Sequence, residues 1–167
     1  AFPYPNELSA IAAAHGFVFC PETAPPPEKT PRFVAHSRTE ILQTPHGPCR
    51  ILLSACDTAG QWALAQLEIA ALAGAPLHRH SREDEIWVVQ SGSFEYSNGR
   101  QRLRAEAGDT IFGPQHTPHM FRCISAQSGT LLDIVLPGAF AGYFRDSAEM
   151  WKNSRMTENN LNRLNSD

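Results

Sequence analysis

Residues 76–92 of the chain read PLHRHSREDEIWVVQSG, and this stretch decides the fold. Successive side chains of a β-strand point to opposite faces, so His78 and His80 share a face and can bind one metal ion. Glu85 has the opposite parity to His80, so the polar residues between them must turn the chain before Glu85 can join the pair. Glu85 then opens the apolar run of residues 86–89, whose composition is typical of a strand.

A fourth candidate ligand lies further along, where residues 113–119, GPQHTPH, form a turn and His119 opens another apolar run. Imidazole and carboxylate ligands from three strands suit a first-row divalent ion, and an octahedral ion would keep positions open for water or substrate. A lone His-x-His pair is more often surface alternation, so the prediction rests on four residues jointly: His78, His80, Glu85 and His119. The predicted cofactor is one divalent transition metal, namely Fe, Mn, Ni or Zn.

Ten short runs rich in β-branched or aromatic residues surround these ligands and are separated by turn residues. They are residues 32–36, 40–43, 50–55, 62–70, 85–90, 93–96, 101–104, 110–112, 119–124 and 130–136. This number of short strands at this spacing predicts a β-sandwich or barrel. Between two of the runs, Asn98-Gly99 tolerates the backbone angles of a tight hairpin, so we expect those two runs to pair antiparallel.

The segments before and after the strands differ from them in composition, so we divide the chain into three regions. Residues 1–31 are an N-terminal proline-rich arm with a short helix over residues 7–15, because consecutive prolines fit neither a helix nor a central strand. Residues 32–137 form the barrel. Residues 138–167 form a C-terminal helix and a polar tail; the helix is amphipathic and could cover one barrel opening, because apolar residues recur at helical spacing at Phe140, Tyr143, Phe144, Ala148 and Trp151.

The amino-acid composition limits which partners and which cellular compartment we expect for the protein. The chain has 167 residues, 42% of them hydrophobic, and a net charge of −3 without a basic cluster, so we expect one domain and no nucleic-acid partner. Its apolar runs fall far short of the roughly 20 residues that cross a bilayer, so we expect no membrane association. The four cysteines show no CxxC pair, which favours reduced thiols in a cytoplasmic protein: Cys20, Cys49, Cys56 and Cys123.

The spacing of the ligands resembles the two motifs of the cupin family. The run His78-x-His80-x4-Glu85-x6-Gly92 matches the first motif, and Gly108-x5-Pro114-x4-His119 is similar to the second. The resemblance implies an all-β fold, the double-stranded β-helix or jelly-roll cupin barrel, with the metal inside near one mouth. More loosely, the LPGAF run at residues 136–140, followed by Tyr143-Phe144, resembles small single-domain quercetin-dioxygenase-like cupins.

Three positions depart from the cupin pattern. The glycine expected six residues before the first histidine is Leu72, the glycine expected before the last histidine is His116, and the asparagine expected four residues after it is Cys123. None of these departures removes a ligand. Metal binding is therefore still expected, while the turn geometry around the second motif differs.

The same alternation predicts a substrate pocket. If Glu85 faces the interior, Trp87 faces it too, and Phe121 shares the face of His119 in the same way. His116 suits a structural or pocket-lining role. An apolar, partly aromatic wall around a Lewis-acidic ion suits a small, flat substrate that chelates through an enol or phenol oxygen. The alternative is that Trp87 and Phe121 only fill the barrel core.

The resemblance leaves the reaction open, because cupins include dioxygenases, isomerases, cyclases, lyases and binders. The leading hypothesis is an oxidoreductase, a dioxygenase acting on a small enolisable or phenolic compound. A non-oxidative isomerase, cyclase, dehydratase or lyase on a similar substrate is the main alternative, and a non-catalytic small-molecule-binding protein is the third. Glu85 is the predicted catalytic residue, because an apolar surrounding would raise the pKa of a detached carboxylate toward the range of a general base.

A homodimer is the last expectation. The proline-rich arm and the apolar face of the C-terminal helix exceed what a lone barrel needs, and exposed edge strands require covering.

Overall fold

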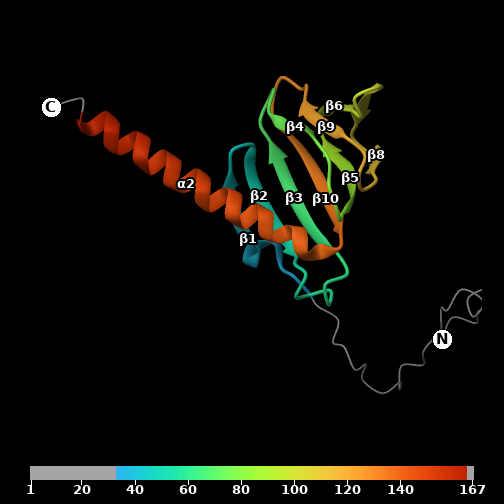
Figure 1. The fold of residues 1–167 in the computed structure, drawn as a ribbon, viewed down its shortest axis with the longest axis horizontal. Helices are drawn as coiled ribbons and strands as arrows, with labels where there is room; N and C mark the ends of the chain where they lie inside the picture. The colour runs from blue at the N-terminus through green and yellow to red at the C-terminus, as the bar shows by residue number, and fades with distance from the viewer. Residues whose placement is uncertain (1–32, 165–167) are drawn as a thin grey trace, which may run out of the picture. The chain divides into compact units, whose positions relative to one another are not determined.

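The computed structural model describes residues 33–164, with side chains described as far as Asn153. Within that range ten strands, two short 3-10 helices and one α-helix are formed (Figure 1). The strands are β1 (Glu40–Thr44), β2 (Gly47–Leu53), β3 (Ala63–Ile69), β4 (Gly74–His78), β5 (Asp84–Ser91), β6 (Ser93–Ser97), β7 (Arg102–Glu106), β8 (Thr110–Gly113), β9 (His119–Cys123) and β10 (Gly129–Leu136). The helices are η1 (His36–Arg38), η2 (Gly138–Phe140) and α2 (Ala141–Leu164).

The strands form two antiparallel sheets that enclose the core. The larger sheet has the order β1-β2-β3-β10-β5-β8, and the smaller has the order β4-β9-β6-β7. Aromatic side chains from the two sheets meet in the core: the ring centroid of Trp87 on β5 lies 5.8 Å from that of Tyr96 on β6 and 5.6 Å from that of Phe121 on β9. The predicted all-β jelly roll, or double-stranded β-helix, is therefore confirmed.

Nine of the ten predicted runs overlap a strand, and two local assignments differ. Residues 33–35 are irregular and lead into η1, so the strand predicted at 32–36 is wrong for the residues described there. Conversely, β4 has the sequence GAPLH, which lacks β-branched residues and is a strand because it pairs with β9. Tertiary pairing outweighs the weak intrinsic preference at β4.

The hairpin predicted at Asn98-Gly99 is confirmed. β6 pairs antiparallel with β7, with Ser97 opposite Arg102. Gly99 has a φ of 84°, a value that favours glycine, and the side-chain oxygen of Asn98 accepts hydrogen bonds from the backbone N–H groups of Arg100 and Gln101.

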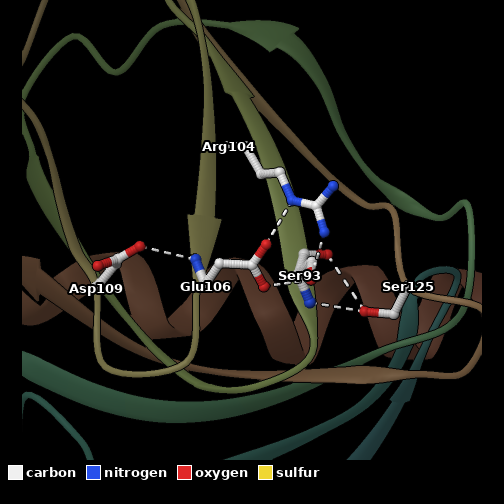
Figure 2. A network of polar contacts seen from close by, with 5 residues as sticks. All are labelled: Ser93, Arg104, Glu106, Asp109 and Ser125. Atoms are coloured by element: carbon white, nitrogen blue, oxygen red, sulfur yellow. Dashed lines mark hydrogen bonds and ion pairs between the residues drawn. The ribbon is translucent and has the colours of Figure 1, made fainter.

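A polar network joins the start of β6, the end of β7, and the segments that precede β8 and follow β9 (Figure 2). The backbone N–H of Ser93 donates to Ser125 Oγ at 2.6 Å, and the hydroxyl of Ser93 donates to Glu106. Glu106 also pairs with Arg104, and its backbone N–H donates to Asp109 Oδ2 at 2.8 Å. His119 begins β9 and Ser125 follows its end, so this network lies at the end of β9 away from the candidate site.

Helix α2 follows β10 and packs on β1 and β3 (Figure 1). Arg145 Nε donates to Glu40 Oε2 at 3.0 Å, which links the helix to the edge strand β1. The helix continues to Leu164, beyond the apolar pattern that ends at Trp151. No helix among the described residues is long and apolar enough to cross a membrane. The predicted arm and the helix predicted over residues 7–15 lie outside the described residues.

Candidate metal centre

Four side chains meet at one end of the barrel. His78 ends β4, His80 follows it, Glu85 lies on β5 and His119 begins β9. One ligand atom of each lies within 4.8 Å of one ligand atom of every other. His78 is brought to His119 by strand register, because the two residues are partners in the β4–β9 pairing. His80 lies beyond the strand, and its carbonyl oxygen accepts a hydrogen bond from the backbone N–H of His116 at 2.8 Å.

Backbone carbonyls orient two of the imidazoles. His78 Nδ1 lies 2.7 Å from the Pro76 carbonyl oxygen, and His119 Nδ1 lies 3.0 Å from the Thr117 carbonyl oxygen. Nδ1–H is therefore the donor in both rings, which leaves each Nε2 with a lone pair. A hydrogen bond from the far ring nitrogen to a carbonyl is the usual way in which a metal-binding histidine is held in place.

The facing atoms lack the partners that buried polar atoms normally have. Glu85 Oε2 lies 2.9 Å from His80 Nε2 and 3.5 Å from His119 Nε2. Despite these distances, none of the three atoms makes a hydrogen bond within the described part of the chain, and all three are buried. Three imidazole nitrogens and one carboxylate oxygen suit a divalent Mn, Fe, Ni or Zn ion, so the residues fit the predicted cofactor.

The electrostatics of the cluster also favour a cation. Burial alone would raise the pKa of Glu85, but the close contacts of its carboxylate with the His119 and His80 imidazoles outweigh burial and lower it. The same contact with Glu85 raises the pKa of His80. Burial lowers the pKa of His78, which keeps that imidazole neutral and available as a ligand.

A fifth ionisable group, Asp133, lies beside Glu85 and was not predicted. It occupies the middle of β10, and its side chain is fully buried. Burial and the neighbouring charge of Glu85 raise its pKa well above the ordinary value. The signal for it was present in the sequence, because Asp133 is the one charged residue in the apolar run TLLDIVL and has the same parity as the inward residues Leu131 and Val135.

A cavity of about 370 Å³ opens onto the cluster. His78, His80, Glu85 and Asp133 line it, together with apolar side chains from both sheets. Residues of η2 and α2 complete the wall, and the Phe140 ring lies 4.7 Å from that of His80. The expectation that the C-terminal helix covers one barrel opening agrees with this lining, which includes Phe140, Tyr143, Phe144, Ser147 and Met150.

The three predicted pocket residues occupy different places. Phe121 lines the cavity. Trp87 is buried behind the cluster, with its ring 5.1 Å from that of His119, and belongs to the core rather than to the cavity wall. His116 is exposed, has a φ of 64° and lies outside the lining; its backbone N–H supports His80 instead. This position favours a structural role for His116 rather than a pocket-lining role.

Fold and cluster together define the class: a jelly-roll barrel with a group of three histidines and one glutamate that can hold a metal ion. Residues 66–135, which are less than half of the chain, match the family model described as a cupin domain. The match contains all four candidate ligands. A comparison with curated proteins gave no match.

Solved structures show the same fold at low sequence identity. KdgF from Halomonas sp. is 21% identical, with a TM-score of 0.58 over 65% of this chain and 94% of that one. A predicted oxalate decarboxylase from Thermotoga maritima is 18% identical, with a TM-score of 0.55 over 64% and 99%. The polyketide cyclase RemF from Streptomyces resistomycificus is 22% identical, with a TM-score of 0.54 over 64% and 80%.

Proposed function

We propose that the protein is a metal-dependent dioxygenase acting on a small enolisable or phenolic compound. The observation that carries the proposal is a four-residue ligand cluster at one end of a largely apolar cavity of about 370 Å³. Such a volume suits a one- or two-ring substrate, and apolar walls with few polar groups select a flat molecule by shape. A bound divalent ion would act as a Lewis acid toward the enol or phenol oxygen.

The residues of the chain have separate tasks in this proposal. His78, His80 and His119 hold the ion, and the carbonyls of Pro76 and Thr117 keep two of these rings aligned. Phe121 and Phe140 enclose the substrate ring and exclude water. Glu85 binds the ion and, when displaced by substrate, takes the proton of the enol or phenol. In this proposal both atoms of O2 enter the cleaved product, and the substrate, which is oxidised, supplies the four electrons that O2 takes up.

The decisive experiment measures oxygen and substrate together. Protein loaded with Fe, Mn, Ni or Zn is incubated with flavonols, catechols and 1,3-dicarbonyls in an oxygen electrode. We expect one O2 consumed per substrate molecule for at least one metal and one compound class. Turnover that continues unchanged under anaerobic conditions would exclude a dioxygenase.

The carboxyl pair of Glu85 and Asp133 favours a second candidate, a non-oxidative isomerase, cyclase, dehydratase or lyase. Such reactions move protons between carbon and oxygen, and two carboxyl groups in contact inside a cavity can relay them. The cyclase and the predicted decarboxylase among the solved structures share the fold with this chain, so the fold alone does not separate the two candidates. Binding of a panel compound without turnover would support the third reading, a non-catalytic binder.

A further inference from the structure

Asp133 is a buried carboxyl group with no assigned role. Its side chain is 0% exposed, and neither of its oxygens has a hydrogen-bond partner within the described part of the chain. Burial of an unpaired carboxyl destabilises a fold, because the water it loses is not replaced. An unsatisfied buried group of this kind requires an explanation, and on the wall of a cavity a catalytic role or a bound partner supplies one.

Its position places it beside the candidate metal site. β10 pairs with β5 so that Asp133 lies opposite Trp87 and Val135 lies opposite Glu85. Asp133 and Glu85 are therefore diagonal neighbours on the inward face, close enough for the charge of Glu85 to raise the pKa of Asp133. A carboxyl group has two oxygens, so a contact with Glu85 leaves the second oxygen for another partner.

The cavity wall also carries Thr44, His46, Arg79, Tyr143 and Ser147, but none of these residues is buried. The same cavity is lined near Asp133 by Cys49, Leu67 and Phe121, whose side chains make no strong hydrogen bond. Cys49 stays a neutral thiol, because burial raises its pKa to about 12, with Asp133 adding to the effect. Outside the metal cluster, Asp133 is therefore the one buried carboxyl group among the described residues that line the cavity.

We propose that Asp133 accepts a hydrogen bond from a hydroxyl group of the substrate. This inference rests on the proposed metal-dependent function and narrows its substrate class. The oxygen that binds the metal and the hydroxyl that reaches Asp133 must lie on neighbouring atoms, because Glu85 and Asp133 are themselves neighbours. Catechols and α-hydroxy ketones meet this condition, whereas a simple phenol does not. Both protonation states of the carboxyl keep an acceptor oxygen, so the contact does not depend on titration.

The test compares catechol with 2-methoxyphenol, which keeps the ring and both oxygens but lacks the second hydroxyl. Binding is measured by calorimetry to zinc-loaded protein, because zinc has no redox chemistry and prevents turnover. The variants are Asp133→Leu, which removes the acceptor, Asp133→Asn, which keeps an acceptor oxygen, and Cys49→Ala, a control that alters the same wall without touching Asp133.

Wild type is expected to prefer catechol, partly through chelation and partly through Asp133. In Asp133→Leu we expect that preference to fall about tenfold, with zinc content unchanged, whereas Asp133→Asn loses less and Cys49→Ala keeps the wild-type preference. Asp133→Leu replaces the unpaired buried carboxyl with an apolar side chain of similar size. This variant should therefore fold at least as stably as wild type.

Two outcomes would overturn the inference: an unchanged catechol preference in Asp133→Leu, or a loss of zinc in that variant, which would make Asp133 a support of the metal site. The proposed function fails separately. Absence of oxygen uptake together with an Asp133-dependent preference would reject the dioxygenase and keep the substrate contact, and failure of wild type to bind zinc would reject both.

Discussion

Glu85 differs from the three histidines because it can both bind a metal and move a proton. Its carboxylate contacts His80 and His119, and Asp133 lies next to it. A coordinated imidazole has no second role in proton transfer. Single substitutions can therefore distinguish metal binding, which all four residues share, from proton transfer, which only Glu85 can perform.

The substitution Glu85→Gln should separate metal binding from turnover. Three imidazoles remain and the amide oxygen coordinates weakly, so we expect metal affinity to fall by no more than about 100-fold and saturating metal to restore full occupancy. Turnover should fall by about 10²–10⁴-fold, the usual contribution of a general base. Metal content and rate are measured on the same samples, with His80→Ala as the comparison that loses both. If added metal restores the rate of Glu85→Gln, Glu85 is a ligand alone.

The pKa of His80 predicts how metal affinity depends on pH. Contact with Glu85 raises this pKa above 6.5, so in the metal-free protein the protonated pair stabilises the fold below about pH 6.5. That contribution is lost as the pH rises through the raised value. A metal requires the neutral ring, so zinc affinity should fall about tenfold per pH unit below the pKa of His80.

Competition with a chromophoric chelator between about pH 5 and 8 measures this slope. Glu83 also raises the pKa of His80, and the two side chains lie 3.7 Å apart. Glu83→Gln should therefore move the fall in affinity to lower pH while leaving the ligands intact. Zinc affinity that stays constant over the whole range would contradict the assignment of His80 as a ligand.

At the scale of elements, two features position the site: the pairing of β4 with β9, and the cover formed by η2 and α2. The first brings His78 opposite His119. The second places Phe140 against the His80 ring. Each can be perturbed without changing a ligand.

The pairing of β4 with β9 depends on a close approach at Gly74. A Cβ added there would collide with the Phe121 carbonyl oxygen and lie 2.7 Å from Arg122 Cα, both in the backbone of β9. We expect Gly74→Ala to lower the free energy of unfolding by about 3 kcal/mol or more and to weaken zinc binding. Gly99→Ala is the matched control: its φ is also positive, but no atom lies within 4 Å, so the loss should be about 1 kcal/mol. Urea unfolding that gives equal losses for the two variants would refute the close approach.

The aromatic cover should affect ligand binding rather than metal binding. Phe140 lies on the cavity wall and stacks on Tyr143 at 5.1 Å. We expect Phe140→Ala to weaken catechol binding to zinc-loaded protein by about tenfold, which corresponds to the loss of one partly buried aromatic ring, while zinc content is unchanged. Phe112→Ala removes a ring that is 57% exposed on β8 and should have no effect. Equal effects of the two variants would place the ligand elsewhere.

At the scale of the whole molecule, we propose that the chain is a homodimer. The edge strands β1, β8, β4 and β7 end the two sheets, and Tyr143 and Met150 on α2 expose large apolar side chains. Sedimentation equilibrium at micromolar concentration should give twice the chain mass. Deletion of residues 1–30 should weaken the association. If the protein is a monomer both with and without these residues, the proposed homodimer is wrong.

Much of the fold and of the candidate site could be predicted from the sequence because both depend on local patterns. The period-2 alternation placed Glu85 and Trp87 on one face and His119 and Phe121 on another, and all four are buried. The spacing of His78, His80, Glu85 and His119 predicted that these four would meet, and the structure brings their ligand atoms together. Strand β4, in contrast, has no local preference for its conformation.

Contacts between residues distant in the chain could be seen only in the tertiary structure. Trp87 and Phe121 looked equivalent in the sequence and both belong to the core, yet only Phe121 also lines the cavity. Asp133 meets Glu85, 48 positions away in the chain, through the register of β10 with β5. Alternation determines which face a side chain points to, but the packing of the sheets determines what it meets there.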